Sequence, residues 1–594
     1  MIPSISPVSA FFASGRFIVT TSVCPSRSTS ACGSLNGNLQ ESLGDIAQND
    51  NMFYFGGVAL NIADLLEHAV DAVPERVAVV CGDRRVTFAE LEERANRLAH
   101  HLAVHGVGRG SHIGVYSRNS IEALEAMIAA YKLRAIAVNV NYRYVHGELK
   151  YLFTNADLVA LVHERQYADK VAAVLPETPK LKHVVVVDDG SDRDYRRYGG
   201  VDYETSLAAE SPERDFGERS ADDLYILYTG GTTGYPKGVL WRHEDIWRAL
   251  GGGINFVTGE YVPDEWTLAE QGRSGSLVRL PAAPLIHGAA QWAAFGALFT
   301  GSPVVLVPRF DAHDVWKAVQ DNKVQVLTIV GDAMARPLIE AYREGDYDAS
   351  SLVALSSHAA LFSHSVKQDF LGILPNVVIT DAIGSSESGF TGIGMVGKDS
   401  DHSAGPRVQF GKDAILLDEE GNAVAPEPGA IGLIARRGHV PLGYYNDPEK
   451  SRTIFAEVDG ARYVVPGDYA RYEEDGTVTL LGRGSQCVNT GGEKVYPEEV
   501  EGALKSHPDV FDALVIGVPD ERLGQRVAAV IQPREGAVVD FASVEAHVRG
   551  EIAGYKVPRT VWLAEEIGRT PSGKPDYPWA QRYAAEHPPA TQPV

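Results

Sequence analysis

The sequence predicts an α/β protein with a large N-terminal domain and a small α+β domain at the C-terminus. From residue 77 to about residue 330, short β-branched runs alternate with amphipathic helical stretches, as is typical of a mostly parallel, buried sheet. Beyond Gly405 the strands become short and are separated by glycines, prolines and acidic turns, which predicts a small β-rich subdomain. After Gly482 a compact pattern of helices and a strand pair predicts the C-terminal domain.

The individual elements follow from these patterns. Apolar, β-branched runs predict strands at residues 77–83, 112–117, 158–164, 183–189, 302–308 and 324–330. Helical periodicity predicts helices at residues 88–106 and 120–133. Short strands of the β-rich subdomain are expected at residues 414–424, 432–438 and 477–483. In the C-terminal domain we expect helices at 497–508 and 543–552, and a strand pair at 512–519 and 525–533.

Charge and composition disfavour several classes of protein. The formal charge of −24 would repel nucleic acid and an anionic membrane surface. No run approaches 18 uninterrupted apolar residues, so no membrane-spanning helix is predicted. The 4 cysteines are too irregularly spaced for a disulfide framework or a zinc site, and a reducing cytoplasm suits them best. Residues 1–51 are predicted to be a disordered extension, which leaves residues 52–483 for the large domain and residues 484–594 for the small one.

The strongest single signal is a glycine-rich loop that follows an apolar, strand-like run. Its sequence is YTGGTTGYPKGV, at residues 228–239. Consecutive glycines let backbone N–H groups converge on a phosphate, threonine hydroxyls add donors, and a lysine adds charge. The loop is not of the Walker A type, because Lys237 lies between Pro236 and Gly238 and the GxxxxGK[ST] spacing fails. The residues expected to bind phosphate are Thr229, Gly230, Gly231, Thr232, Thr233, Gly234 and Lys237.

This loop resembles the signature loop of the acyl-adenylate-forming superfamily, which contains acyl-CoA synthetases, luciferases and the adenylation domains of peptide synthetases. Other segments resemble further motifs of that family and occur in the same order. They are PLIHG at 284–288, DAIGSSESG at 381–389, GDYARYEEDGTVTLLGR at 467–483, NTGGEKVYPEEVE at 489–501 and RTPSGKPDY at 569–577. The set is most similar to bacterial fatty-acid–CoA ligases, a branch that includes enzymes acting on sterol side-chain acids.

The resemblance implies a site for ATP and Mg²⁺. Glu387 matches the family's magnesium ligand, and its carboxylate is the hard oxygen donor that Mg²⁺ prefers. Ser386 is expected to donate to the α-phosphate, and Asp381 to accept from the adenine amino group. Asp468 and Arg483 are expected to hold the ribose hydroxyls.

Lys574, in the C-terminal PSGK sequence, is the predicted catalytic residue. A carboxylate that attacks the α-phosphate of ATP brings two anions together, so a nearby cation stabilises the transition state. One such contact at about 4 Å and an effective dielectric near 20 is worth about 4 kcal/mol, or roughly three powers of ten in rate.

In the family the small domain rotates after adenylation, so the C-terminal domain is predicted to be mobile. Ser485 occupies the pivot position, and the segment that contains Gly491 and Gly492 is expected to form the CoA site. Lys556 could contact CoA phosphates or simply lie at a helix end.

The acyl group is expected to bind beside the PLIHG segment. By resemblance, His287, Gly288, Ala289 and Trp292 line this pocket, with His287 also close to the reaction. Small residues around one tryptophan suggest room for a wide apolar group, although residues 288–299 also fit a plain buried helix. One departure from the family concerns adenine: Ile383 stands where relatives place an aromatic ring, four residues before the magnesium ligand.

We therefore predict an ATP-dependent acid:CoA ligase that acts on medium- or long-chain fatty acids or steroid side-chain carboxylates, with ATP, Mg²⁺ and coenzyme A. A peptide-synthetase domain is disfavoured, since no carrier motif follows and no acid near PLIHG could pair with a substrate amine. A fatty acyl-AMP ligase that passes its adenylate to a carrier protein remains open, as does oligomer formation. A non-catalytic nucleotide-binding protein would not require Lys574.

Overall fold

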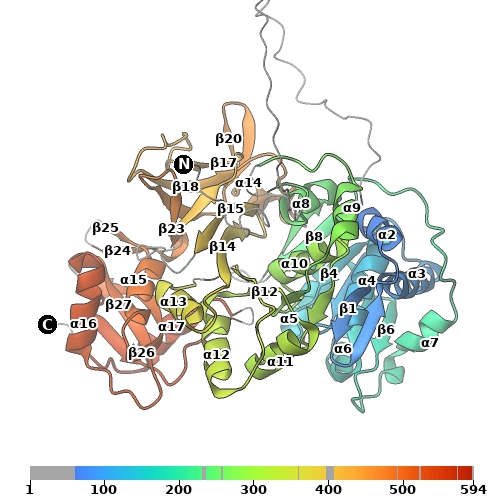
Figure 1. Cartoon of the computed structure of the whole chain (residues 1–594), viewed down its shortest axis with the longest axis horizontal. Helices are drawn as coiled ribbons and strands as arrows, with labels where there is room; N and C mark the ends of the chain where they lie inside the picture. The colour runs from blue at the N-terminus through green and yellow to red at the C-terminus, as the bar shows by residue number, and fades with distance from the viewer. Residues whose placement is uncertain are drawn as a thin grey trace, which may run out of the picture.

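The computed structural model describes residues 61–591, except 230–235, 256–258, 359, 361, 397–406, 491–492, 521–522 and 571–572. The extension predicted at residues 1–51 lies outside the described residues. The described part confirms the predicted α/β fold: a large α/β body, a β-rich region above it and a small α+β region at one end (Figure 1).

The body is built on two sheets. In the first, the parallel strands are, in spatial order, β1 (Val77–Cys81), β11 (Val304–Leu306), β10 (Arg279–Pro281), β12 (Val326–Ile329), β13 (Ala354–Ser357) and β14 (Val378–Ser385), with β2 (Arg84–Thr87) antiparallel at the edge. In the second, all strands are parallel, in the order β4 (Ile136–Asn139), β3 (His112–Tyr116), β5 (Leu158–Glu164), β6 (His183–Val187) and β7 (Val201–Asp202). The strands predicted from β-branched runs are confirmed: β1, β3, β5, β6, β11 and β12 lie within the predicted ranges.

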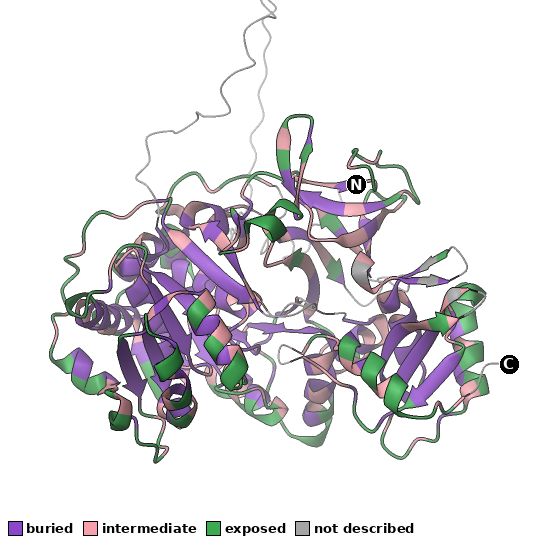
Figure 2. Cartoon of the chain, turned by 180° about the vertical axis from the view of Figure 1, so that it is seen from behind, coloured by how far each residue is buried: buried purple, intermediate pink, exposed green. Residues whose placement is uncertain are grey.

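One hydrophobic core joins the two sheets through the helices between them. It contains Val79 of β1 and Val115 of β3 together with apolar residues of the helices. These helices are α2 (Ile62–Ala72), α3 (Phe88–Val104), α4 (Ile121–Lys132) and α10 (Gly288–Phe299). Figure 2 shows that the strands of the body are buried, whereas the helices at its periphery have an exposed outer face. Peripheral helices of the body are α5 (His146–Asn155), α6 (Ala168–Val174), α7 (Tyr203–Ala208), α8 (His243–Leu250), α9 (Thr267–Ser274), α11 (Ala312–Asn322), α12 (Gly331–Glu344) and α13 (His364–Ile373).

The β-rich region continues the first sheet instead of forming a separate one. β14 pairs with β15 (Gly389–Val396), and β15 pairs with β16 (Arg407–Phe410), which leads into the remaining strands. These are β17 (Ala414–Leu417), β18 (Ile431–Arg436), β20 (Phe455–Val458), β21 (Ala461–Val464), β22 (Asp468–Tyr472) and β23 (Val478–Arg483). A third, three-stranded sheet contains β8 (Leu224–Thr229), β9 (Lys237–Arg242) and β19 (Gly443–Tyr444), which α14 (Pro448–Arg452) follows.

The C-terminal region has its own sheet and its own small cores. Its strands are β24 (Val488–Thr490), β25 (Glu493–Val495), β26 (Val510–Asp520), β27 (Gly524–Pro533) and β28 (Thr560–Leu563). Its helices are α15 (Pro497–Lys505), α16 (Phe541–Glu551) and α17 (Tyr577–Glu586). The boundary predicted between residues 483 and 484 falls at the end of β23, before the chain enters this sheet.

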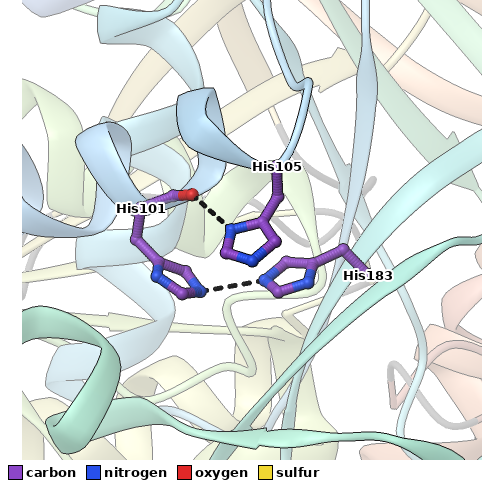
Figure 3. Close-up of side chains that lie close together, drawn as sticks. All are labelled: His101, His105 and His183. Carbon is purple, nitrogen blue, oxygen red and sulfur yellow. Dashed lines mark hydrogen bonds between the residues drawn. The ribbon is translucent and has the colours of Figure 1, made fainter.

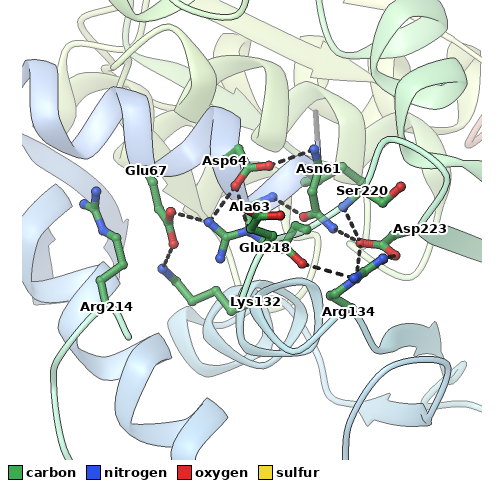
Figure 4. A network of polar contacts seen from close by, with 12 residues as sticks. Asn61, Ala63, Asp64, Glu67, Lys132, Arg134, Arg214, Glu218, Ser220 and Asp223 are labelled. Atoms are coloured by element: carbon green, nitrogen blue, oxygen red, sulfur yellow. Dashed lines mark hydrogen bonds and ion pairs between the residues drawn. The ribbon is translucent and has the colours of Figure 1, made fainter. Parts of the chain in front are cut away.

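Buried ion pairs fix the first helices of the body (Figure 4). Lys132, at the end of α4, is only 1% exposed and binds both Glu67 of α2 and Glu92 of α3, the latter at 2.9 Å. Nearby, Arg134 holds Asp223, which precedes β8, at 2.9 Å. A buried lysine is tolerated only when its charge is paired, so these contacts specify how the helices pack.

Two buried histidines, His243 and His163, have hydrogen-bond partners that suit the neutral form of the imidazole. His243 accepts a hydrogen bond from the Ile62 N–H at Nδ1 (3.1 Å) and lies 3.2 Å from the Leu224 carbonyl through Nε2. His163 likewise lies between the Glu164 carbonyl (2.7 Å) and the Tyr198 hydroxyl (2.9 Å). Burial lowers the pKa of each ring to about 4. Each ring thus uses one nitrogen as donor and the other as acceptor, the arrangement of the uncharged form.

These two rings predict a loss of stability in mild acid. Each histidine binds a proton near pH 6.5 when unfolded but only near pH 4 when folded. Stability is therefore fully present above pH 6.5 and falls as the pH drops towards 4, by about 2 kcal/mol per histidine at pH 5. Thermal unfolding at pH 7.5, 6.0 and 5.0 measures this, and the H243Q variant is expected to lose part of the pH dependence. An unfolding midpoint that stays constant over this range would contradict the expectation.

Candidate active site

The candidate active site lies where strands of the body end and the β-rich and C-terminal regions meet them. β8 and β9 form a hairpin in which Thr229 pairs with Lys237, so the phosphate-binding loop is their connection. The predicted loop residues Gly230, Gly231, Thr232, Thr233 and Gly234 lie outside the described residues. Ligands of open α/β sheets bind at the carboxyl ends of the strands. The connection between β8 and β9 begins at such an end, because the last residues of β8 lie beside Asn139 at the end of β4.

Asn139 fixes the start of the predicted phosphate loop, and no sequence motif pointed to this residue. This buried residue ends β4; its amide Nδ2 donates to the carbonyls of Tyr228 (2.8 Å) and Ile286 (2.7 Å). Its Oδ1 accepts from the Tyr228 N–H at 2.8 Å. One side chain therefore ties the end of β8 to the PLIHG segment, and so sets the phosphate loop beside the expected acyl site.

Glu387 lies in the turn between β14 and β15, and Tyr444 of β19 holds it. The Tyr444 hydroxyl donates to Oε1 of Glu387 at 3.0 Å. Lys237 lies over the Tyr444 ring, 5.4 Å from its centroid, and 3.4 Å from Asp447. The strand pairing of Tyr444 with Val239 brings these groups together, because β19 adds to the hairpin that bears the loop. Glu387, the predicted magnesium ligand, and Lys237 therefore both contact Tyr444 and lie on the same side of the site.

Asp468 and Arg483 stand directly opposite each other on the antiparallel strands β22 and β23. The Arg483 Nε donates to Oδ1 of Asp468 at 3.2 Å. Asp468 is the main cause that raises the pKa of the Arg483 guanidinium. The pair predicted to bind ribose is therefore preassembled by strand register.

Lys574 reaches this pair from the C-terminal region. It keeps solvent-exposed surface, yet the surrounding protein removes enough water to lower its pKa. The positive charge of Arg483 lowers the pKa further, whereas Glu387 and Asp468 oppose the shift. The predicted catalytic lysine and the predicted nucleotide ligands are therefore close enough to act on one another electrostatically.

A chain of charges supports the loop that bears Lys574. Within the C-terminal region, Arg569 pairs with Asp512, and Asp512 lies 3.5 Å from Lys505 of α15. Lys505 in turn lies 3.8 Å from Asp332 of α12, in the body. The chain of charges is nearly dry, since Lys505 is 2% and Asp332 3% exposed. It joins the two regions beneath the lysine.

His287 precedes α10, and its Nε2 is a buried atom without a hydrogen-bond partner among the described residues. Burial, with help from Lys574 and Arg143, lowers the pKa of this imidazole to about 3. The ring is therefore neutral at physiological pH, and one of its nitrogens remains available to a bound substrate.

Two nucleotide residues have structural partners that the sequence did not predict. The Asp381 carboxylate on β14 is buried and forms an ion pair with Lys367 of α13. The backbone carbonyl of Ser386 accepts a hydrogen bond from Trp241 Nε1 at 3.0 Å. Ile383, in place of an aromatic ring, packs partly against a cluster of the β-rich region. The adenine role of Asp381 stays a prediction. In that role the carboxylate would accept a hydrogen bond from the adenine amino group while it remains paired with Lys367.

The predicted acyl-pocket residues divide into two groups. Gly288 and Ala289 are partly exposed at the start of α10, and a Cβ on Gly288 would lie 2.6 Å from Leu227 of β8, so only glycine fits there without a shift. Trp292 is 3% exposed, and its indole donates to Tyr225 at 3.3 Å. Trp292 therefore belongs to the packed core of the body.

The residues predicted for the CoA stage lie in the C-terminal region. Lys556 forms an ion pair with Glu499 at 2.6 Å. The backbone of Ser485 belongs to a short turn, Gly484–Gln486, that links the two regions. Gly491 and Gly492 lie outside the described residues.

Comparison with known proteins identifies the family. Residues 66–445 match the family model described as AMP-binding enzyme, and residues 499–574 match the AMP-binding enzyme C-terminal domain. The first match covers more than half of the chain, so this protein belongs to the AMP-binding enzyme family.

Curated relatives narrow the class. The chain is 60% identical over 531 residues to a 3-oxocholest-4-en-26-oate–CoA ligase of Rhodococcus rhodochrous, covering 88% of this chain and 96% of that protein. It is 58% identical over 533 residues to a medium/long-chain-fatty-acid–CoA/3-oxocholest-4-en-26-oate–CoA ligase of Mycobacterium tuberculosis, covering 89% and 97%. These relatives confirm the predicted enzyme class, a CoA ligase.

Solved structures confirm the fold. An anthranilate CoA ligase, AuaEII, in complex with anthranoyl-AMP matches with a TM-score of 0.77 and 24% identity, over 89% of this chain and 98% of that one. ATP-bound MatB from Rhodopseudomonas palustris matches with a TM-score of 0.73 and 25% identity, over 88% and 99%. Within the described residues, no helix is long and apolar enough to cross a membrane.

The contact between Tyr444 and Glu387 gives a testable prediction. The Y444F variant removes one hydrogen bond to a carboxylate, which contributes about 1.5–3 kcal/mol when fully formed. Glu387 then loses its fixed orientation, and we expect kcat/KM for MgATP to fall about tenfold while the fold is retained. Steady-state kinetics with varied MgATP measures this.

The neighbouring tyrosine supplies the control. Tyr445 donates to Asp157 at 3.0 Å, away from the nucleotide residues, so Y445F should leave kcat/KM for MgATP unchanged. Equal effects of the two substitutions would show that Tyr444 acts only through local stability.

Proposed function

We propose that this CoA ligase activates a bulky apolar carboxylic acid, either a steroid side-chain carboxylate or a medium- or long-chain fatty acid. The acid first becomes an acyl-adenylate and is then transferred to the thiol of coenzyme A. The observation that carries the proposal is the convergence of Lys574 with Glu387, Asp468, Arg483 and His287 from four separate parts of the chain.

In the first half-reaction, a substrate carboxylate oxygen attacks the α-phosphate of ATP and pyrophosphate leaves. The Lys574 ammonium lies where it can neutralise both anions as they meet, which is the role that its sequence predicts. Its lowered pKa reflects a site that already holds positive charge and little water, so bound ATP supplies the missing negative charge.

Residues of this chain would orient the nucleotide. Asp468 is placed to accept from ribose hydroxyls and Arg483 to donate to them, since strand register already fixes the pair. The donor set fits Mg²⁺: Glu387 has one carboxylate oxygen held by Tyr444, and the described structure shows no hydrogen bond to the other. When bound there, the ion would be held by Glu387 and would neutralise negative charge on the phosphates.

The acyl group would lie beside the start of α10. There His287 offers a neutral imidazole, while Gly288 and Ala289 add no bulk. The choice of substrate rests on the relatives named above, whose activities are on a sterol side-chain acid or on medium- and long-chain fatty acids.

In the second half-reaction, the CoA thiolate attacks the acyl carbonyl and AMP leaves. We propose that the C-terminal region rotates about the turn that contains Ser485, so that Lys574 withdraws and the 489–501 segment approaches the adenylate. The ion pair between Lys505 and Asp332, which spans both regions, would break in this motion. Lys556 could then exchange Glu499 for a CoA phosphate.

Substitution of Lys574 separates the two half-reactions. We expect K574A to reduce adenylate formation by about a hundredfold or more, because the transition state loses its counter-charge. CoA transfer from supplied acyl-AMP should remain largely intact. Pyrophosphate release and thioester formation are followed separately, and K574R serves as a charge-retaining control. Equal loss of both half-reactions in K574A would contradict the role.

A substrate panel tests the proposed function as a whole. The enzyme is supplied with ATP, Mg²⁺ and acids from acetate through palmitate to a steroid side-chain acid, with and without CoA, and products are identified by mass spectrometry. We expect acyl-CoA, with the highest kcat/KM on the long apolar acids. Pyrophosphate without thioester would indicate an adenylate-only enzyme, and preference for acetate would exclude the proposed substrates.

A further inference from the structure

Three histidines lie close together, away from the candidate active site; Figure 3 shows their rings side by side. His101 is in the last turn of α3, His105 follows at the end of that helix, and His183 is the first residue of β6. β6 runs parallel to β5, β3 and β4, so its first residue lies at the amino ends of these strands. Asn139, which ends β4, lies at the other edge, beside the active site.

We propose that His101, His105 and His183 form a binding site for a divalent transition-metal ion, for which Zn²⁺ is the best candidate. One nitrogen atom of each ring lies within 4.8 Å of the others. The Nε2 atoms of His101 and His183 are 2.9 Å apart, and the ring of His105 stacks on His183 with centroids 3.8 Å apart. No other part of the proposed reaction uses these residues.

The geometry is close to that of a metal site. Zn–N distances of about 2.0–2.1 Å with tetrahedral angles require the ligand nitrogens to be roughly 3.4 Å apart. His101 and His183 need to separate by about half an ångström from the present arrangement. His105 needs a larger tilt, which its exposed position at the end of α3 allows. The spacing of four residues between His101 and His105 places both on one face of the helix.

The outer contacts of the histidines also suit a metal. His105 is 2.8 Å from the His101 carbonyl through Nδ1, which leaves its Nε2 for an ion. His101 has the carboxylate of Glu210 3.7 Å from its Nδ1. Ligating histidines commonly donate their second N–H to a carbonyl or a carboxylate, which fixes the tautomer and the ring orientation.

The two buried rings are ready to bind without losing a proton. Burial lowers the pKa of His101. Burial, together with the neighbouring His105, lowers the pKa of His183 to about 4. Both are neutral at pH 7. They share a single hydrogen between the Nε2 atoms, and a shift of that hydrogen to Nδ1 of the same ring exposes both lone pairs.

Three imidazole ligands select the type of ion. They suit Zn²⁺, Ni²⁺ and Cu²⁺, whereas Mg²⁺ and Ca²⁺ prefer oxygen ligands. A bound ion would join the end of α3 to the start of β6, where the hydrogen bond between His101 and His183 and the stacking of His105 on His183 now link the two elements. The site would therefore stabilise the body without taking part in the reaction.

The test uses untagged, full-length protein stripped of metal with a chelator. Co²⁺ is titrated first, because tetrahedral coordination by nitrogen gives visible absorption bands, and Zn²⁺ is then titrated by calorimetry. We expect one ion per chain, displacement of Co²⁺ by Zn²⁺ but not by excess Mg²⁺, and a higher unfolding midpoint with Zn²⁺.

Substitutions identify the ligands. His105 is exposed, so H105Q should fold normally and bind Zn²⁺ at least tenfold more weakly, without the rise in unfolding midpoint. The neighbouring His100 pairs with Asp215 at 3.0 Å instead, so H100Q is the matched control and should bind like the unmodified protein. The proposal is overturned if no stoichiometric Zn²⁺ binding occurs, or if H105Q and H100Q bind Zn²⁺ equally well.

Discussion

The contact between the loop of Lys574 and the body is the constraint on which the site depends. Gly573, next to this lysine, lies beside α12: a Cβ added to it would be 3.6 Å from Ala333, an ordinary contact distance. Beneath it, the pairing of Lys505 with Asp332 joins the two regions with almost no exposed surface. The role proposed for Lys574 in adenylation requires such contacts, because its side chain is flexible and its backbone must be held in place.

A second contact between the regions depends on a protonated acid. Burial beside Glu501 raises the pKa of Glu498 to about 8, so this carboxyl is mostly uncharged at neutral pH. It lies against Gly482 of β23, where φ is +108 degrees and an added Cβ would overlap the Glu498 carboxyl group. An uncharged group can lie in such a position without a counter-ion, and it would leave at modest cost in the proposed rotation.

The electrostatics of the site explain how an acidic protein can bind a highly anionic substrate. The chain carries a formal charge of −24, yet Lys237, Arg483 and Lys574 come from three distant segments to one place. Carboxylates lie beside two of these cations: Asp468 accepts a hydrogen bond from Arg483, and Asp447 lies 3.4 Å from Lys237. Local placement of charge therefore matters more than the net charge, because fields of distant surface groups are screened within about 10 Å.

The sequence by itself determined the fold class, the order of the elements and the motifs. Hydrophobic periodicity and β-branched runs indicate which surfaces must be buried, and the PSGK and GDYA segments contain the side chains that the proposed chemistry uses. Tertiary structure alone decided that Asn139 ties the loop to PLIHG, that Tyr444 holds Glu387, that Asp381 pairs with Lys367, and that Trp292 packs in the core. The reason is physical: these contacts join residues far apart in the chain, and no local pattern encodes which distant partner a polar side chain will meet once strands and helices have packed.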